Sequence, residues 1–303
     1  MGFPPFLSAG GPGRPGAILR FMVRIAVTML ATFALLARPA GSAESPSLKT
    51  LLALIAGHVA DFKAQFSLVV GAEHYDQVQR DMNGRTHTRQ MLSDVFFFRP
   101  EAEGPAMTVR TVRQVDGQDI KTAAMRIEEA LALPPGQRTQ KLRALADAGA
   151  LYNLGNLQRN FNEPTVALTF AAADYQPRFR FSLDGMESAD GQTLQRVAFS
   201  EVEHPTIIRD GRSGSDVRAS GRLWTTDAGI IMRTELRLKK RDVAATIRVA
   251  YGTEPRLGIM VPAMMDEDYR FPDLSNGRFI LITAHASYSE YRRFETSARI
   301  VEP

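Results

Sequence analysis

Two histidines, His74 and His87, lie on either side of the strongest turn signal in the chain, and their spacing raises the question of a shared metal. If Asn83-Gly84 forms a two-residue hairpin turn, His74 faces Ser93 and His87 faces Arg80. The two imidazoles are then about 20 Å apart along the ladder, at ~3.3 Å per residue. A shared metal needs ligand distances of about 2.0–2.1 Å. We therefore expect no metal site.

The candidate nucleophiles and paired acids give no stronger signal. The stretch "GRSGS" at 211–215 resembles half of a nucleophile elbow but lacks the final glycine, and its composition is typical of a loop. Glu128 and Glu129 are adjacent on an expected helix, where neighbours do not face each other. Glu201 and Glu203 are expected to share one strand face, as solvent-facing acids often do. We expect no catalytic residue and no cofactor, and hence no enzyme.

Two further features allow a binding role. Trp224, the single tryptophan, is either a core or rim aromatic with its N–H satisfied or the gate of a cavity. The segment "HPTIIRDGRSGSDVRASGR" contains Arg209, Arg212, Arg218 and Arg222 among few acids. It is either a solvated loop or a contact for an anionic head group or partner. The solvated loop is the favoured interpretation.

The N-terminal stretch "RIAVTMLATFALLARPAGSAES" indicates export. Ile25–Leu36 is apolar and uncharged, yet shorter than the ~20 residues that span a membrane. Basic residues precede it, and Gly41-Ser42-Ala43 offers small residues for a signal peptidase. We expect residues 1–43 to be a signal peptide cut after Ala43. Met22 is an alternative start, which would make residues 1–21 an over-extended lead. A buried helix is the competing interpretation of the apolar run.

Removal of residues 1–43 changes the charge. The full chain has 37 Lys+Arg and 33 Asp+Glu, and the removed segment contains four arginines and no acid, so the net charge falls from +4 to zero. A nucleic-acid partner is not expected without a basic footprint, and "LKKR" at 238–241 is expected to be a solvated hairpin end. The absence of cysteine excludes disulfides and a lipid-modified cysteine. We expect a periplasmic or secreted protein with no transmembrane segment after cleavage.

Hydrophobic periodicity divides the mature chain, expected to be one domain over 44–303. A helix stripe runs from Leu48 to Phe62, with Ser45 or Ser47 as its cap. Residues 66–120 alternate as strands, and a helical insert follows at about 121–160. From residue 164 onward the segments alternate again, beginning with Val166, Leu168 and Phe170. The short turns between them predict an antiparallel sheet.

This pattern also predicts the architecture. One face of the strands is apolar and the other is charged, so the apolar face needs a cover. A long twisted sheet tends to curl. We therefore expect an α+β fold: a curved antiparallel sheet, an open and unclosed β-barrel, with helices covering the concave face.

The segment "GRLWTTDAGIIMRTELRL…MVPAMMDEDY", together with the export signal and the amphipathic first helix, resembles the lipoprotein-localisation carriers of the LolA/LolB type. That resemblance implies an unclosed barrel lined with apolar side chains and covered by helices. The stretches "VRTVRQVDGQDI", "ALYNLGNLQRNFNEPTVALTF" and "RFRFSLDG" are similar to an uncharacterised family of exported bacterial proteins, over most of the mature chain. That similarity implies no activity, cofactor or substrate.

The combined expectation is a periplasmic binding or carrier protein for a hydrophobic or amphipathic ligand, such as a lipid or a lipoprotein acyl chain. The alternative is a non-catalytic envelope interaction module with a fully packed interior and an envelope protein as its partner. An apolar pocket above ~300 Å³ would favour the carrier. The candidate ligand-binding residues are Trp224, Met232, Leu236, Phe179, Phe181 and Arg222.

Overall fold

The structure is a computed structural model, and it describes residues 45–67, 69–81, 83–98, 107–120, 125–155, 159, 161–189, 191–211, 213–241, 243–272 and 279–293. The predicted signal peptide, residues 1–43, and the possible start at Met22 lie outside the described residues. All described residues belong to one compact unit, Ser45–Pro303.

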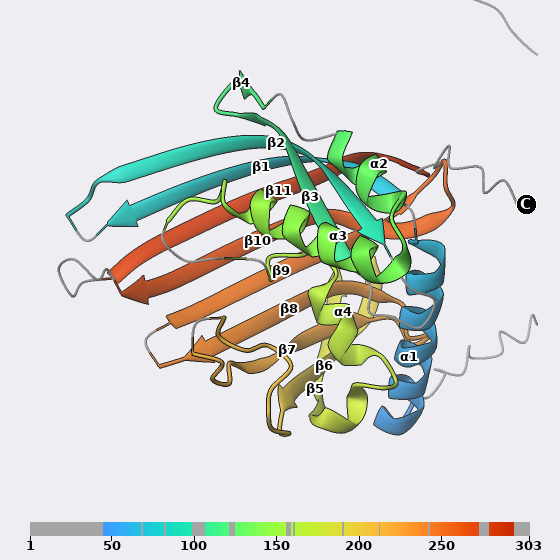
Figure 1. The fold of residues 1–303 in the computed structure, drawn as a ribbon. Helices are drawn as coiled ribbons and strands as arrows, with labels where there is room; N and C mark the ends of the chain where they lie inside the picture. Colours follow the sequence, from blue (N-terminus) through green and yellow to red (C-terminus); the bar gives the residue numbers. More distant parts are fainter. Residues whose placement is uncertain are drawn as a thin grey trace, which may run out of the picture. The chain divides into compact units, whose positions relative to one another are not determined.

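A single antiparallel sheet organises this unit, with the strand order β4-β3-β2-β1-β11-β10-β9-β8-β7-β6-β5 (Figure 1). The strands are β1 Val69–Asp81, β2 Thr86–Phe98, β3 Met107–Val115, β4 Gln118–Asp119, β5 Phe179–Ala189, β6 Gln192–Glu201, β7 Arg218–Thr225, β8 Ile231–Lys240, β9 Val243–Glu254, β10 Ile259–Pro272 and β11 Phe279–Arg293. The end strands β4 and β5 do not pair with each other, so the barrel is open. The predicted open, curved antiparallel sheet is confirmed.

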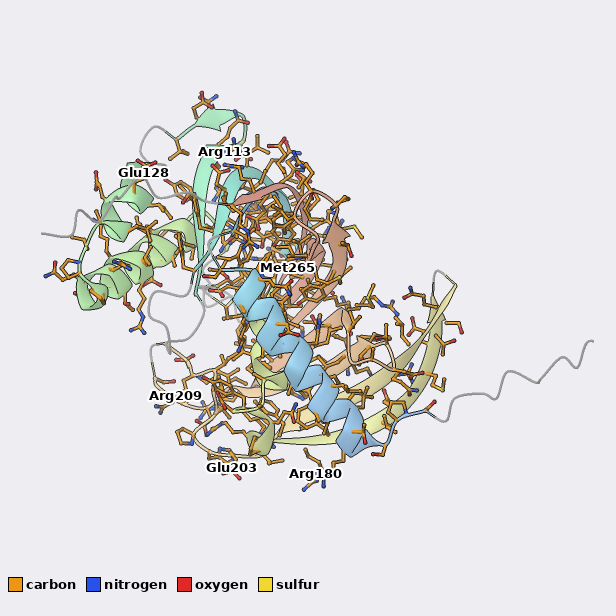
Figure 2. The ribbon with its side chains drawn as sticks, turned by 90° about the vertical axis from the view of Figure 1, so that its right-hand side faces the viewer. Arg113, Glu128, Arg180, Glu203, Arg209 and Met265 are labelled. Carbon is orange, nitrogen blue, oxygen red and sulfur yellow. The ribbon has the colours of Figure 1, made fainter. Side chains whose placement is uncertain are left out.

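Helix α1 covers the concave face, as predicted. The helices are α1 Leu48–Gln65, α2 Met125–Leu131, α3 Pro135–Ala150 and α4 Val166–Ala171, with a short 3-10 turn, η1, at Gln176–Arg178. Ser47 caps α1 by accepting a hydrogen bond from the Thr50 amide at 3.3 Å. Leu51, Ile55 and Val59 are fully buried against the main core, and Figure 2 shows α1 running across the inside of the curved sheet.

Helices α2 and α3 do not cover the concave face. The side chains of Phe96, Phe98 and Val109 pack with Ile127 and Leu142 in a second apolar cluster. Alternation along β2 places Phe96 and Phe98 on the face opposite Phe97, which belongs to the main core. The sheet therefore has an apolar cover on both faces at its β2–β3 end. This arrangement departs from the expectation of one wet side throughout.

The segment Val166–Ala171 is a helix, α4, so its prediction as a strand is wrong. Val166, Leu168 and Phe170 alternate with small residues, which mimics a strand pattern. The buried positions are Ala167, Leu168, Phe170 and Ala171, which is the spacing of a helix face.

The β1–β2 hairpin has a three-residue loop and not the two-residue turn expected. The Asp81 amide donates to the Arg85 carbonyl, and Gly84 donates back to the Asp81 carbonyl at 3.1 Å. Gly84 has φ of 79°, a left-handed conformation that glycine adopts without strain. The pairing is thereby shifted by one residue, so that His74 faces Leu92 and His87 faces Gln79.

Candidate functional site

An apolar cleft lies between the N-terminal part of α1 and the edge strand β5. It has a volume of about 390 Å³. Its apolar lining comes from Leu48, Leu52, Ala173, Pro177, Phe179 and Phe181. An apolar groove of this size, open to solvent, can hold part of an acyl chain or an aromatic group.

Local sequence holds the two walls of this cleft together. Gln176, which also lines it, donates from Nε2 to the Leu52 carbonyl and to the Ala171 carbonyl, both at 2.9 Å. These bonds tie α1 to the turn that follows α4. Pro177 lies in the first turn of η1, where its missing N–H costs nothing, and η1 ends directly at Phe179. The two walls of the cleft, α1 and the segment from η1 into β5, are therefore held in place by specific hydrogen bonds.

Behind the cleft, aromatic side chains close the core. The Phe179 ring lies 5.2 Å from that of Phe170 and 5.8 Å from that of Phe199, edge-on to the latter. Phe181 lies 6.1 Å from Phe179 and is only partly buried. The cleft thus ends on a packed aromatic wall, and the space beneath α1 is occupied by side chains of the main core.

The other half of the concave face carries a buried polar cluster that was not expected from the sequence. Arg110 donates from Nε and Nη2 to the two carboxylate oxygens of Glu73, at 2.5 and 2.9 Å. The Arg110 guanidinium also lies 5.0 Å from the centre of the Tyr75 ring. The Glu73 side chain has no exposed surface. This pair is a buried bidentate ion pair, which needs good geometry to offset its desolvation.

Glu267 is the centre of the same cluster. Its Oε2 accepts from the hydroxyls of Tyr75 at 2.9 Å and Tyr269 at 2.5 Å. Arg159 Nη1 lies 3.7 Å from that oxygen, and its guanidinium stacks 4.8 Å from the centre of the Tyr269 ring. Burial raises the pKa of Glu267, and the nearby charge of Arg159 opposes that shift. The cluster holds a carboxyl group that is easier to protonate than an exposed one.

Arg159 anchors the chain that follows α3 to the sheet. Its Nη2 donates to Gln77 Oε1 at 2.5 Å and to the Leu154 carbonyl at 3.0 Å, and the side chain has no exposed surface. Asn162, from the amide-rich stretch after α3, donates from Nδ2 to the Tyr75 hydroxyl at 3.3 Å. The signal in the sequence was the polar set Glu73, Tyr75 and Gln77, spaced by two along one strand face.

The candidate ligand-binding residues are not brought together at one place. Phe179 and Phe181 line the cleft. Leu236 has no exposed surface and lies in the main core. Met232 is half-buried beside the irregularity where the pairing of β7 with β8 shifts, between Trp224 and Thr225. A role in ligand binding stays a prediction for each of them.

Trp224 and Arg222 lie on the outer face of β7, opposite the buried Leu223. The Trp224 indole donates to Glu187 Oε2 at 2.7 Å, and the Arg233 guanidinium lies 5.0 Å from the centre of the Trp224 ring. Arg222 donates from Nε to Asp184 Oδ2 at 2.6 Å. Both side chains thus belong to an ionic network on the convex side of the sheet.

The other chemical candidates lie apart from the cleft. Glu201 ends β6 and accepts from the Ile207 amide at 2.8 Å, whereas Glu203 is exposed beyond the strand, so the expectation of a shared strand face is wrong. Among the described residues, no group of acidic or histidine side chains is arranged to hold a metal ion. None of the described helices combines the length and apolar character needed to span a membrane.

No protein-family model and no curated protein matches the sequence. Several solved structures are similar. A putative outer membrane lipoprotein-sorting protein domain from Vibrio parahaemolyticus has 12% identity and a TM-score of 0.37, over 82% of this chain and 94% of that one. A DUF1329 family protein from Desulfovibrio piger has 12% identity and a TM-score of 0.35, over 83% and 94%.

A LolA superfamily protein from Nitrosomonas europaea has 10% identity and a TM-score of 0.31, over 82% of this chain and 97% of that one. Lipoprotein-sorting and LolA-type proteins are thus among the similar structures. At TM-scores this low, no ligand, partner or activity is transferred to this chain.

Proposed function

We propose that this chain is a non-enzymatic binding or carrier protein outside the cytoplasm, which holds the apolar part of an amphipathic ligand in the cleft between α1 and β5. The signal peptide expected at residues 1–43 would direct it to the periplasm or to the medium. The ligand class is a lipid or a lipoprotein acyl chain.

The observation that carries this proposal is the cleft itself. Its volume of about 390 Å³ is larger than the ~300 Å³ at which small-molecule sites typically begin. Six of its seven lining residues are apolar, and an alkyl chain buried there would gain about 0.8 kcal/mol per CH₂ group removed from water. Phe181, only partly buried without a ligand, would gain further burial.

Mass spectrometry of the gently purified protein tests for a natural ligand, and a dansyl-labelled undecanoic acid tests the cleft. Ala173 is exposed and lines the cleft, so Ala173→Trp fills it at little cost to the fold. We expect this variant to lose most of the dansyl fluorescence gain. The matched control is Ala60→Trp, an exposed position on α1 that does not line the cleft, and it should bind like the parent.

A clean protein mass, together with equal dansyl binding by the parent and Ala173→Trp, would contradict the carrier. That result would favour the second candidate, an envelope interaction module. The supporting observation is the filled concave face, together with the edge strand β5. There Leu183 and Met186 are 48% and 56% exposed, and within the described part of the chain no strand pairs with the outer side of β5. Such an edge can accept a strand from a partner.

A further inference from the structure

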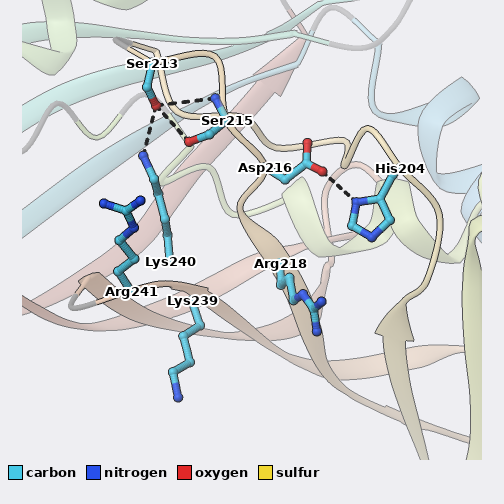
Figure 3. A pocket seen from close by; sticks show the side chains of 8 residues that line it. All are labelled: His204, Ser213, Ser215, Asp216, Arg218, Lys239, Lys240 and Arg241. Carbon is cyan, nitrogen blue, oxygen red and sulfur yellow. Dashed lines mark hydrogen bonds and ion pairs between the residues drawn. The ribbon is translucent and has the colours of Figure 1, made fainter.

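A second cavity, separate from the apolar cleft, lies where the loop after β6 meets the β8–β9 turn (Figure 3). It has a volume of about 820 Å³ and shares no lining residue with the cleft. The lining residues fall into cations, Arg218, Lys239, Lys240 and Arg241, and others, His204, Asp216, Ser213 and Ser215. Only one of them is acidic, so the cavity is a candidate for an anionic ligand.

The strand register places two like charges against each other at this cavity. Arg218 of β7 pairs directly with Lys239 of β8. Like charges directly opposite on an antiparallel pair are destabilising. Figure 3 shows both side chains extending to the same side of the strands, and both are exposed. Within the described part of the chain, neither has an ion-pair partner. A bound anion would relieve this repulsion.

Arg241 adds a third cation, at a backbone position that disfavours it. Its φ is 45°, in the left-handed region where glycine or asparagine is preferred. Arg241 is exposed, and among the described residues it has no acidic partner. Lys240 pairs with Val243, so Arg241 is the first residue of a two-residue hairpin turn, which requires this left-handed conformation. The exposed guanidinium, and not the backbone, makes Arg241 a candidate contact for a ligand.

The acid that lines the cavity is already engaged. Asp216 accepts from the Thr206 amide at 3.1 Å and lies 2.6 Å from His204 Nδ1. The hydrogen bond with His204 is the main reason that the pKa of Asp216 lies below its usual range. Lys240 is likewise held, by Asp210 at 2.8 Å and by Ser213 at 3.1 Å. The cations left for a ligand are therefore Arg218, Lys239 and Arg241.

The geometry points to a binding site for a phosphate-bearing polar group, centred on the like-charge pair Arg218 and Lys239, with Arg241 at the adjacent turn. Guanidinium and ammonium groups bind phosphate oxygens by charge-assisted hydrogen bonds. A volume of about 820 Å³ accommodates a phosphorylated group of sugar size or larger. The phosphate can belong to a soluble ester or to the head group of a phospholipid. This site does not depend on the proposed function of the apolar cleft.

Calorimetric titration with inorganic pyrophosphate, and sedimentation with phosphatidylglycerol or phosphatidylcholine vesicles, test the site. Arg241→Gly removes a cation and suits the left-handed backbone, so affinity should fall about tenfold while the unfolding midpoint stays equal or rises. Arg218→Gln with Lys239→Gln should also weaken binding, and removal of the like-charge pair should not destabilise the fold. Lys141→Gln, on the exposed side of α3, is the matched control and should bind like the parent.

Each outcome decides the proposal. Pyrophosphate binding that both cavity variants weaken, and that the control retains, supports a soluble phosphate ligand. Binding only to phosphatidylglycerol vesicles, with the same dependence on the variants, supports a phospholipid head group. Absence of binding to both probes overturns the proposal. Binding that Arg241→Gly and the double variant leave unchanged overturns it as well, because the charge would then act elsewhere.

Discussion

Arg110 of β3 forms its bidentate ion pair with Glu73 of β1 across an intervening strand. The two strands are not neighbours, because β2 lies between them in the sheet. The residue that pairs with Glu73 on β2 is Ser93, whose short side chain is fully buried. Arg110 also donates to the carbonyl of Asn162 at 3.4 Å. One guanidinium thus connects the β3 end of the sheet, the centre of the concave face and the chain that precedes α4.

Replacement of Arg110 by leucine should therefore be severe. It leaves Glu73 charged, buried and unpaired, and breaking a buried pair in this way costs about 3–5 kcal/mol. The double variant Arg110→Leu/Glu73→Leu removes both charges and should recover a large part of that loss. Urea unfolding of the two variants and the parent gives the comparison. A double variant that is less stable than the single one would contradict this, because the unpaired charge of Glu73 would then not be the source of the loss.

We expect Glu163 to make the stability of the fold depend on pH. Burial raises the pKa of Glu163 from 4.5 to about 7, against the opposing effects of a hydrogen bond from Thr108 and the charge of Arg110. Between these pH values the folded chain keeps a proton that the unfolded chain has released. The free energy of unfolding should therefore fall as the pH rises from about 4.5 to about 7, and level off above it.

Glu163→Gln isolates this contribution, because glutamine keeps the shape and cannot ionise. We expect the difference in stability between variant and parent to grow in favour of the variant as the pH rises through that range. Urea unfolding at several pH values measures it. Parallel curves for the two proteins would mean that Glu163 titrates as an exposed acid does.

Two glycine substitutions should have opposite effects. A methyl group at Gly221 of β7 would overlap the Glu235 carbonyl oxygen and lie 2.7 Å from Phe199 Cζ, so Gly221→Ala should destabilise by about 3 kcal/mol or more. Gly57 lies in the exposed middle of α1 with no atom near its would-be methyl group. Gly57→Ala should stabilise by about 1 kcal/mol. Thermal unfolding of both variants, each against the parent, provides the measurement.

Much of this fold was readable from local periodicity. The stripe over 48–62 predicted α1, with Ser45 or Ser47 as its cap, and the structure shows Ser47. Alternation predicted a single open antiparallel sheet, because both patterns reflect burial on one face. The secondary structure of short segments was harder to predict from the sequence. Six residues from Val166 to Ala171 fit either period, and only packing against the core decides between helix and strand. The hairpin loop length depended on the backbone of Gly84, which the dipeptide signal alone does not fix.

The sites were far less predictable, since they combine residues distant in sequence. Phe179 and Phe181 were predicted from the sequence as ligand-binding candidates, but Leu48 and Leu52 line the cleft with them only after α1 has packed on the sheet. The buried cluster contains Glu73, Arg159 and Glu267. These residues are far apart in the sequence, so the sequence alone does not show that they lie close together in the fold. Trp224 and Arg222 share a strand with core residues, yet their side chains face outward. The sequence pattern does not say which face of a half-covered sheet a ligand would use, so it could not separate these two residues from the candidates that face the core.

Trp224 offers a direct test of its two interpretations. It lies on the convex side of β7, held by Glu187 and stacked by Arg233, whereas the cleft opens between α1 and β5. A non-fluorescent fatty acid bound in the cleft should therefore leave the fluorescence emission of Trp224 unchanged. Glu187→Gln weakens the indole hydrogen bond and should shift that emission without changing ligand affinity. Quenching of Trp224 by saturating ligand, in step with binding, would instead mean that it gates the ligand site, because only a residue near the ligand or moved by it would respond.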